Sequence, residues 1–174
     1  MGDLEQEMDE AHGLMMNGDF AGAVKKFSKI IKANPNVADA YFGKAEAALG
    51  DSNVTPEEVI ECYRKAVTID PKNPLYWSSY AVYLIEQSKF DEAEAAYNKA
   101  AETDSDNAPF YFSEFAVEYA MRAPSSMRAF LDGKDLDDKM KEVMQRKEDS
   151  IKKKALLYLL KSIGISAEDA KRLL

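Results

Sequence analysis

The chain has 174 residues, of which 46% are hydrophobic and 31% are charged, and its formal net charge is −8. A chain of this length can form a packed core, and its negative charge argues against binding to nucleic acid. The single cysteine excludes an intramolecular disulfide and a cysteine-ligated zinc site. The acidic first ten residues do not resemble a signal peptide and no apolar stretch could span a membrane, so we expect a cytoplasmic protein.

The acidic charge is concentrated in the first two thirds of the chain. Residues 1–123 contain 22 acidic and 11 basic residues, whereas residues 124–174 contain 9 acidic and 12 basic residues. The change of composition coincides with Pro124-Ser125-Ser126, which is typical of a turn. We therefore predict two parts, a body at 1–123 and a C-terminal extension at 124–174.

Three segments of the body, at 18–35, 55–71 and 88–105, repeat one pattern. In each, a small or β-branched residue precedes an aromatic residue by four positions, and an apolar residue follows the aromatic residue by three. These spacings place the apolar side chains on one face of a helix. The residues that fill the pattern are Ala23, Phe27 and Ile30; Val59, Tyr63 and Ala66; and Ala93, Tyr97 and Ala100.

A second set recurs upstream of these segments, at steps of 34, 36 and 34 residues. Its members are Ala11, Ala45, Ala81 and Phe115. The residues four positions before them are Glu7, Tyr41, Trp77 and Tyr111. The longer middle step indicates a two-residue insertion between Ala48 and Val59. Because insertions are accommodated in turns, each unit is predicted to consist of two helices with a short connection.

The sequence also contains signals for helix ends. Thr55-Pro56-Glu57-Glu58 is a capping box with proline at the first helical position, which predicts a helix start. Pro35 and Pro71 each follow a predicted second helix, and proline cannot continue a helix.

This pattern resembles the tetratricopeptide repeat. The resemblance rests on Gly18-Asp19-Phe20 through Pro35, on 41–48 and on 77–101, and it covers about residues 4–107 as three repeats, with the first helix of a fourth at 108–123. Departures are Glu7 for an aromatic residue, Pro56 for the turn aromatic and Ser105 for the closing proline. The resemblance implies an all-α solenoid of antiparallel helix pairs, with a concave groove lined by the first helices and a helical C-terminal extension.

The resemblance also implies which residues face that groove, namely the fifth, ninth and twelfth positions of each first helix. In this chain they are Met8, His12 and Met15; Phe42, Glu46 and Leu49; Ser78, Val82 and Ile85; and Phe112, Ala116 and Tyr119. Eight of these twelve residues are large and apolar or aromatic, and such a surface is typical of a binding site. We expect the groove to hold an apolar or amphipathic helical segment, from a protein or peptide partner or from this chain's own C-terminal helix.

One known family function can be tested on the residues themselves. Chaperone-binding tetratricopeptide domains hold a terminal carboxylate with lysine, asparagine and arginine side chains. The corresponding positions here are Met8, His12, Gly43, Leu75 and Ser79 or, one repeat later, Phe42, Glu46, Ser79, Pro109 and Ser113. Neither set offers a cation, so no binding of chaperone tails through such a clamp is expected.

The C-terminal extension is predicted to be helical. Leu136, Met140, Val143 and Met144 share one helical face within 135–146. Asp149-Ser150 could cap a following helix at 151–163, and Gly164-Ile165 is typical of a glycine helix stop. Ser166 would then open a last short helix that ends at Leu174.

Three interpretations of the amphipathic helix at 151–163 remain open. It could pack on the last repeat or into the groove as a cap, or form a contact in a homo-oligomer. With its lysines Lys152, Lys153 and Lys154, it could also lie on an anionic membrane, although the acidity of the chain argues against this. A self-associating scaffold or a membrane-surface protein is therefore the alternative to a groove-binding module.

No set of residues predicts catalysis. His12 has no second histidine or cysteine nearby in sequence, and Cys62 lies on a predicted helix without a catalytic partner. A phosphate-binding glycine loop, a nucleophile elbow and a spaced carboxylate–histidine set are all missing from the sequence. We therefore expect no catalytic residue, no cofactor and no metal site, and a protein–protein interaction module rather than an enzyme.

Overall fold

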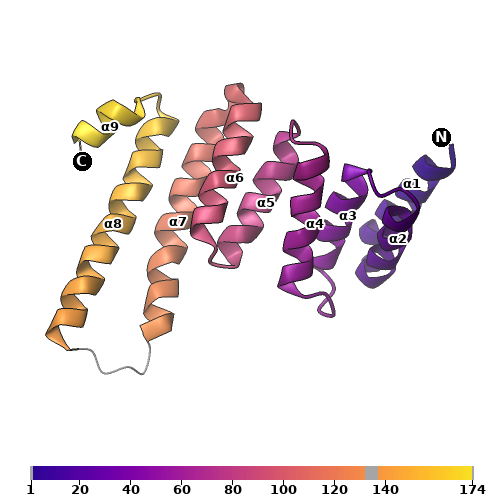
Figure 1. Ribbon diagram of the computed structural model, residues 1–174, viewed down its shortest axis with the longest axis horizontal. Helices are drawn as coiled ribbons and strands as arrows, with labels where there is room; N and C mark the ends of the chain where they lie inside the picture. Colours follow the sequence, from indigo (N-terminus) through magenta and orange to yellow (C-terminus); the bar gives the residue numbers. More distant parts are fainter. Residues whose placement is uncertain (1, 132–136, 174) are drawn as a thin grey trace. The chain divides into compact units, whose positions relative to one another are not determined.

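A computed structural model describes residues 2–131 and 137–173 as helices joined by short turns, with no strand among the described residues (Figure 1). The chain divides into two compact units, Met1–Tyr80 and Ala81–Leu174, and this division falls within helix α5 (Pro74–Glu86). The boundary that we predicted at residue 123 lies inside unit 2, and it stays a prediction.

Unit 1 consists of helical hairpins. It contains α1 (Gly2–Met16), α2 (Phe20–Ala33), α3 (Ala38–Ala48), α4 (Pro56–Ile69) and the first half of α5. From α1 to α4, each helix packs against the one that precedes it in the chain. The predicted pairs of helices with short connections are confirmed.

The repeated small and aromatic residues form the core of unit 1. Ala11, Ala23, Phe27 and Ile30 are fully buried in one cluster. Gly43 on α3 lets the Phe27 ring approach closely, because a Cβ atom at this glycine would lie 2.5 Å from the ring. The apolar helix face predicted from the spacing of Ala23, Phe27 and Ile30 is therefore the face that packs in the core.

The helix start predicted at Thr55 is also confirmed. The Thr55 side chain accepts a hydrogen bond from the backbone N–H of Glu58, and the Glu58 carboxylate accepts one from the backbone N–H of Thr55. This reciprocal pair satisfies two N–H groups that have no partner inside the helix. The two-residue insertion falls in the preceding turn, between α3 and α4, as predicted.

Unit 2 continues from α5 with α6 (Phe90–Thr103), the short 3₁₀ helix η1 (Ser105–Asn107), α7 (Ala108–Leu131), α8 (Asp138–Ser162) and α9 (Ala167–Leu173). The long helices α7 and α8 pack side by side in opposite directions (Figure 1). Leu84, Tyr97, Phe115 and Tyr158 are buried in this unit, so helix pairs and extension share one core.

Two predicted helix boundaries are wrong. Pro124 lies inside α7 rather than in a turn, because one proline removes a single hydrogen bond from a helix that α8 supports along its length. Asp149 lies inside α8, where its carboxylate accepts a hydrogen bond from Gln145 four residues earlier. The cap of α8 is instead Asp137, which accepts from the backbone N–H of Met140 at 2.7 Å.

The predicted end of the extension is confirmed. Gly164 has a φ of +84°, and the backbone N–H of Ile165 donates to the carbonyl of Leu160 at 3.0 Å, which closes α8. The Ser166 hydroxyl then accepts from the backbone N–H of Asp169 and caps α9. Leu136 and Leu174, named in the sequence predictions, lie outside the described residues.

The turns α1–α2 and α5–α6 have the same geometry but different residues. Gly18 has a φ of +78° and Ser88 a φ of +59°. In both turns the backbone N–H of the next residue, Asp19 or Lys89, donates to a carbonyl five residues earlier, at 2.9 and 2.8 Å. Ser88 is thus a non-glycine residue in a left-handed conformation that favours glycine.

Candidate functional site

The predicted groove residues on α1 are partly buried. Met8 and Met15 pack against the core cluster of unit 1. The His12 ring meets the Phe27 ring edge-on at a centroid distance of 5.2 Å, and its Nε2 atom lies 4.0 Å from an Asp39 carboxylate oxygen. His12 is therefore held by its neighbours at an accessible edge of the core.

The predicted residues on α3 form the more accessible part of this surface. The Phe42 ring lies 4.8 Å from the Tyr76 ring and 6.2 Å from the Tyr63 ring. Glu46, the one charged member of the predicted set, accepts a hydrogen bond from the Tyr63 hydroxyl at 2.6 Å. Leu49 is 53% exposed. This face is therefore mostly apolar, and its carboxylate already has a partner.

Three of the predicted groove residues in unit 2 are buried, two of them in the core and Tyr119 beneath α8. Ile85 and Ala116 are buried, because α5 and α7 turn these side chains into the core. Val82 is exposed, and Ser78, just before it in unit 1, uses its hydroxyl to bind the Leu75 carbonyl of its own helix. The position of a residue in the repeat therefore does not by itself predict whether its side chain is buried or exposed.

The last two predicted residues, Phe112 and Tyr119 on α7, lie beneath α8. The Tyr158 ring lies 5.9 Å from the Phe112 ring and 4.6 Å from the Phe115 ring. The Lys154 ammonium lies 5.3 Å from the centre of the Tyr119 ring. Of the three interpretations of this helix, packing on the last repeat is the one that the structure shows.

Polar contacts anchor α8 at two places. The Tyr158 hydroxyl donates to the Glu94 carboxylate at 2.8 Å and accepts from the Asn98 amide at 2.9 Å. Lys154 pairs with Glu94 at 2.7 Å. Burial lowers the pKa of Lys154, but the hydrogen bond and charge of Glu94 outweigh it, so the pKa lies above its ordinary value. At the second place, two nitrogens of Arg128 donate to one Glu148 oxygen.

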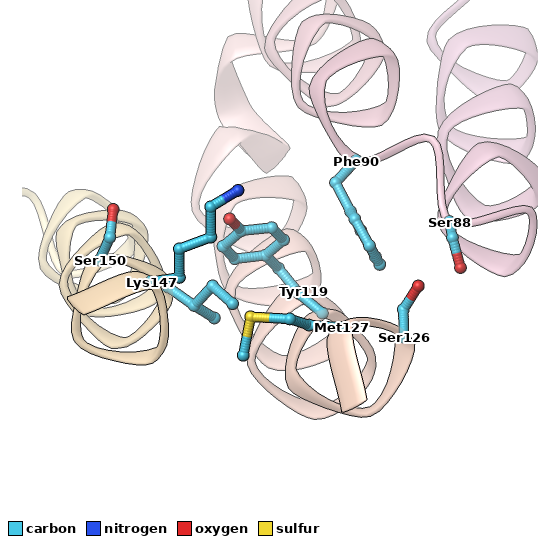
Figure 2. A pocket seen from close by; sticks show the side chains of 9 residues that line it. Ser88, Phe90, Tyr119, Ser126, Met127, Lys147 and Ser150 are labelled. Carbon is cyan, nitrogen blue, oxygen red and sulfur yellow. The ribbon is translucent and has the colours of Figure 1, made fainter. Parts of the chain in front are cut away.

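A pocket of about 540 Å³ opens between α7, α8 and the α5–α6 turn (Figure 2). Its apolar lining consists of Phe90, Tyr119, Ala123, Met127 and Ile151, and its polar lining of Ser88, Ser126, Lys147 and Ser150. The Phe90 and Tyr119 rings meet edge-on at 5.5 Å. Of the lining residues the sequence predicted only Tyr119, because the others meet only if α7 continues past Pro124 and α8 folds back on it.

A second pocket of about 390 Å³ shares Ser150 with the first. Its other lining residues are Glu94, Lys153, Lys154, Leu157 and Lys171. Lysines from two helices, α8 and α9, therefore border one cavity.

We searched the described residues for a metal site, a membrane-spanning helix and a reactive cysteine. No group of three or more histidine, cysteine or acidic side chains is arranged to hold a metal ion there. None of the described helices is long and apolar enough to cross a membrane. Burial raises the pKa of the Cys62 thiol, which disfavours the reactive thiolate.

Comparison with known proteins identifies the repeats. Family models of the tetratricopeptide repeat match residues 8–74 and 62–95. The chain is a tetratricopeptide-repeat protein. Its relatives include a small glutamine-rich tetratricopeptide repeat-containing protein 2 of Mycosarcoma maydis, 30% identical over 103 residues, which are 59% of this chain and 29% of that protein. The chain spans 28–35% of the length of the curated relatives it matches.

Solved structures share the tetratricopeptide-repeat fold. The Sgt2 domain from Aspergillus fumigatus superposes with a TM-score of 0.60 at 16% identity, over 79% of this chain and 91% of that chain. The type III secretion chaperone SycD of Yersinia enterocolitica, in complex with a peptide of the translocator YopD, superposes with a TM-score of 0.56 at 16% identity, over 87% and 94%. At this identity the likeness establishes the fold alone.

Proposed function

We propose that this protein is a non-catalytic interaction module, and that the first-helix face of unit 1 binds an apolar or amphipathic helical segment of a partner. This face consists of Met8, His12, Met15, Phe42, Glu46 and Leu49. A tetratricopeptide-repeat fold supports the general role, and the peptide-bound state of the similar SycD structure is consistent with it. The cytoplasmic location that we predicted stays a prediction.

One observation carries this proposal. The face keeps Leu49 exposed beside the half-buried Phe42, while the framework residues Phe27 and Tyr63 are buried. Its single carboxylate, on Glu46, is engaged by a tyrosine hydroxyl. A partner that covered this face would remove apolar surface from water, and the Glu46 carboxylate would keep the hydrogen bond from Tyr63.

The alternative of self-association or membrane attachment has support of its own. Leu156, Leu159 and Ile163 are exposed along α8. Their spacing of three and four residues places them on one side of the helix, which also bears Lys152. Whichever surface binds, the carboxylate clamp positions offer no cation in either frame.

The groove proposal can be tested with peptides. Amphipathic helical peptides selected for binding to the whole protein should bind the Leu49→Asp variant at least about tenfold more weakly, because the aspartate adds a charge that must be desolvated. Fluorescence anisotropy of labelled peptides measures the affinity. Leu49 is exposed, so the substitution should leave the thermal midpoint nearly unchanged.

The matched control is Met16→Asp. Met16 is an apolar residue at the end of α1, 89% exposed, and it lies outside the predicted set. Its substitution should leave peptide affinity unchanged. Equal affinities of the wild-type protein and Leu49→Asp, or equal losses in both variants, would show that the first-helix face of unit 1 is not the site.

A further inference from the structure

The cleft between α7 and α8 in unit 2 combines an apolar lining with lysine side chains at its border. We propose that it binds an acidic peptide that inserts an apolar side chain. This site is distinct from the first-helix face of unit 1, and the inference does not depend on that face.

The cleft exists for two reasons. Polar contacts fix α8 to its neighbours, and the side chains that face each other between α7 and α8 are small. Arg128 and Glu148 join the two helices at one place, and Tyr158 and Lys154 fix α8 to α6 through Glu94 at another. Next to these anchors the facing positions are occupied by Ala123, Ser126 and Ser150, which are too small to fill the space. The cleft is therefore held open by the rest of the unit.

The apolar part of the cleft suits a large side chain. Phe90, Tyr119 and Ile151 border it from three elements, and Met127 adds a flexible thioether that can adapt to differently shaped groups. Figure 2 shows Phe90, Tyr119 and Met127 around the same space. At about 540 Å³ the pocket lies within the range of ligand sites and exceeds the volume of one leucine or phenylalanine side chain.

The charge of the cleft selects an acidic ligand. Lys147 borders the larger pocket, and Lys153 and Lys171 border the adjoining one. Within the described residues, none of these three ammonium groups has a carboxylate within 4.0 Å, whereas Lys154 and Glu94 neutralise each other. In a chain with a net charge of −8, this local excess of cations favours carboxylates at the cleft.

The shape of the site favours a peptide over a membrane. The cations border two adjoining hollows between helices rather than one flat face, and Ser88, Ser126 and Ser150 contribute to their lining. Hydroxyl groups of this kind can donate hydrogen bonds to peptide carbonyls as well as to carboxylates.

The test uses the whole protein and three labelled peptides of about ten residues. The first carries phenylalanine and leucine among glutamates, the second replaces every glutamate by lysine, and the third replaces phenylalanine and leucine by serine. We expect the first peptide to bind at least about tenfold more tightly than the other two, with an affinity that falls as sodium chloride is raised.

Two variants with matched controls locate the site. Lys147→Gln should weaken binding of the acidic peptide about tenfold and reduce its salt dependence, whereas Lys139→Gln, at an exposed position of the same helix, should not. Ser126→Leu should fill the pocket and abolish binding, whereas Leu at the exposed neighbour, Ser125→Leu, should not. If Ser126→Leu misfolds, as judged by circular dichroism, the lysine pair decides.

The outcomes separate this inference from the proposed function. Loss of binding in Lys147→Gln with none in Leu49→Asp supports the cleft, and the reverse overturns it. Equal binding of the acidic and basic peptides also overturns it. If the free protein forms a dimer that Ser126→Leu disrupts, the occupant is a second copy of the chain, and the inference is overturned. If phosphatidylserine vesicles compete with the peptide for binding, the occupant is a lipid, and the inference is overturned as well.

Discussion

Two buried tyrosines of unit 2 differ in what surrounds their hydroxyl groups. The Tyr158 hydroxyl makes hydrogen bonds with Glu94 and Asn98. The Tyr97 hydroxyl is buried, and no described atom forms a hydrogen bond of normal geometry with it. Burial is the main cause of the raised pKa of Tyr97, and the negative charge of Glu114 adds to it. A buried polar group without a partner is destabilising, whereas a bonded one stabilises.

Removing the hydroxyl should therefore destabilise the protein at Tyr158 but not at Tyr97. Tyr158→Phe should lower the free energy of unfolding by about 1–2 kcal/mol, because Glu94 and Asn98 lose a partner. Tyr97→Phe should leave it unchanged or raise it by up to about 1 kcal/mol. Urea denaturation measures both, and each variant serves as the other's control. A loss of equal size in the two variants would mean that the Tyr97 hydroxyl has a partner after all.

At the scale of elements, the sequence predicted helix ends well where the signal is local. Thr55 and Gly164 act through bonds to residues three to five positions away, and both were located correctly. Pro124 and Asp149 were misjudged, because contacts between α7 and α8 outweigh weak local signals and only the folded chain reveals those contacts. The α7–α8 cleft was missed for the same reason.

The helix α8 is expected to protect the aromatic residues of α7 from water. Deleting residues 137–174 should expose Phe112, Phe115 and Tyr119, increase the fluorescence of a hydrophobic dye, and lower the free energy of unfolding by at least about 3 kcal/mol. The control deletes only 167–174, which removes α9 and leaves Tyr158 in place. Unchanged dye binding after the longer deletion would contradict the role of α8 as a cap.

At the scale of the molecule, the repeats were predictable because their framework residues recur at steps of 34 to 36 residues and pack within the hairpins. The candidate site was less predictable. Leu49 and Val82 are exposed as expected, but Ile85 and Ala116 occupy corresponding positions and are buried. A position in the repeat fixes a direction on its helix, whereas accessibility depends on the neighbouring helix.

The tyrosines make the whole molecule sensitive to alkali. Burial raises the pKa of Tyr76 to about 12, and the Asp39 charge adds to this. Burial is also the main cause of the raised pKa of Tyr97, Tyr111, Tyr119 and Tyr158. Unfolded tyrosines lose their protons near pH 10, so above that pH the unfolded chain binds fewer protons than the folded one.

The free energy of unfolding should therefore be unaffected by these groups below pH 10 and fall as the pH rises beyond it. Tyr76 alone should contribute a fall of about 2 kcal/mol between pH 10 and 12. In Tyr76→Phe this part of the slope should disappear, as measured by urea denaturation across that range. A slope identical to that of the wild-type protein would contradict the raised pKa.

The Ser88 turn shows how a local conformation can work against stability. Glycine adopts the same backbone shape at position 18 without strain, whereas a serine with a φ of +59° is disfavoured by about 1 kcal/mol. In Ser88→Gly that strain would be relieved, but the hydroxyl at the rim of the cleft would be lost. The Ser88→Gly protein would then be more stable but would bind its ligand in the cleft more weakly. Stability favours glycine at this position, whereas ligand binding favours serine.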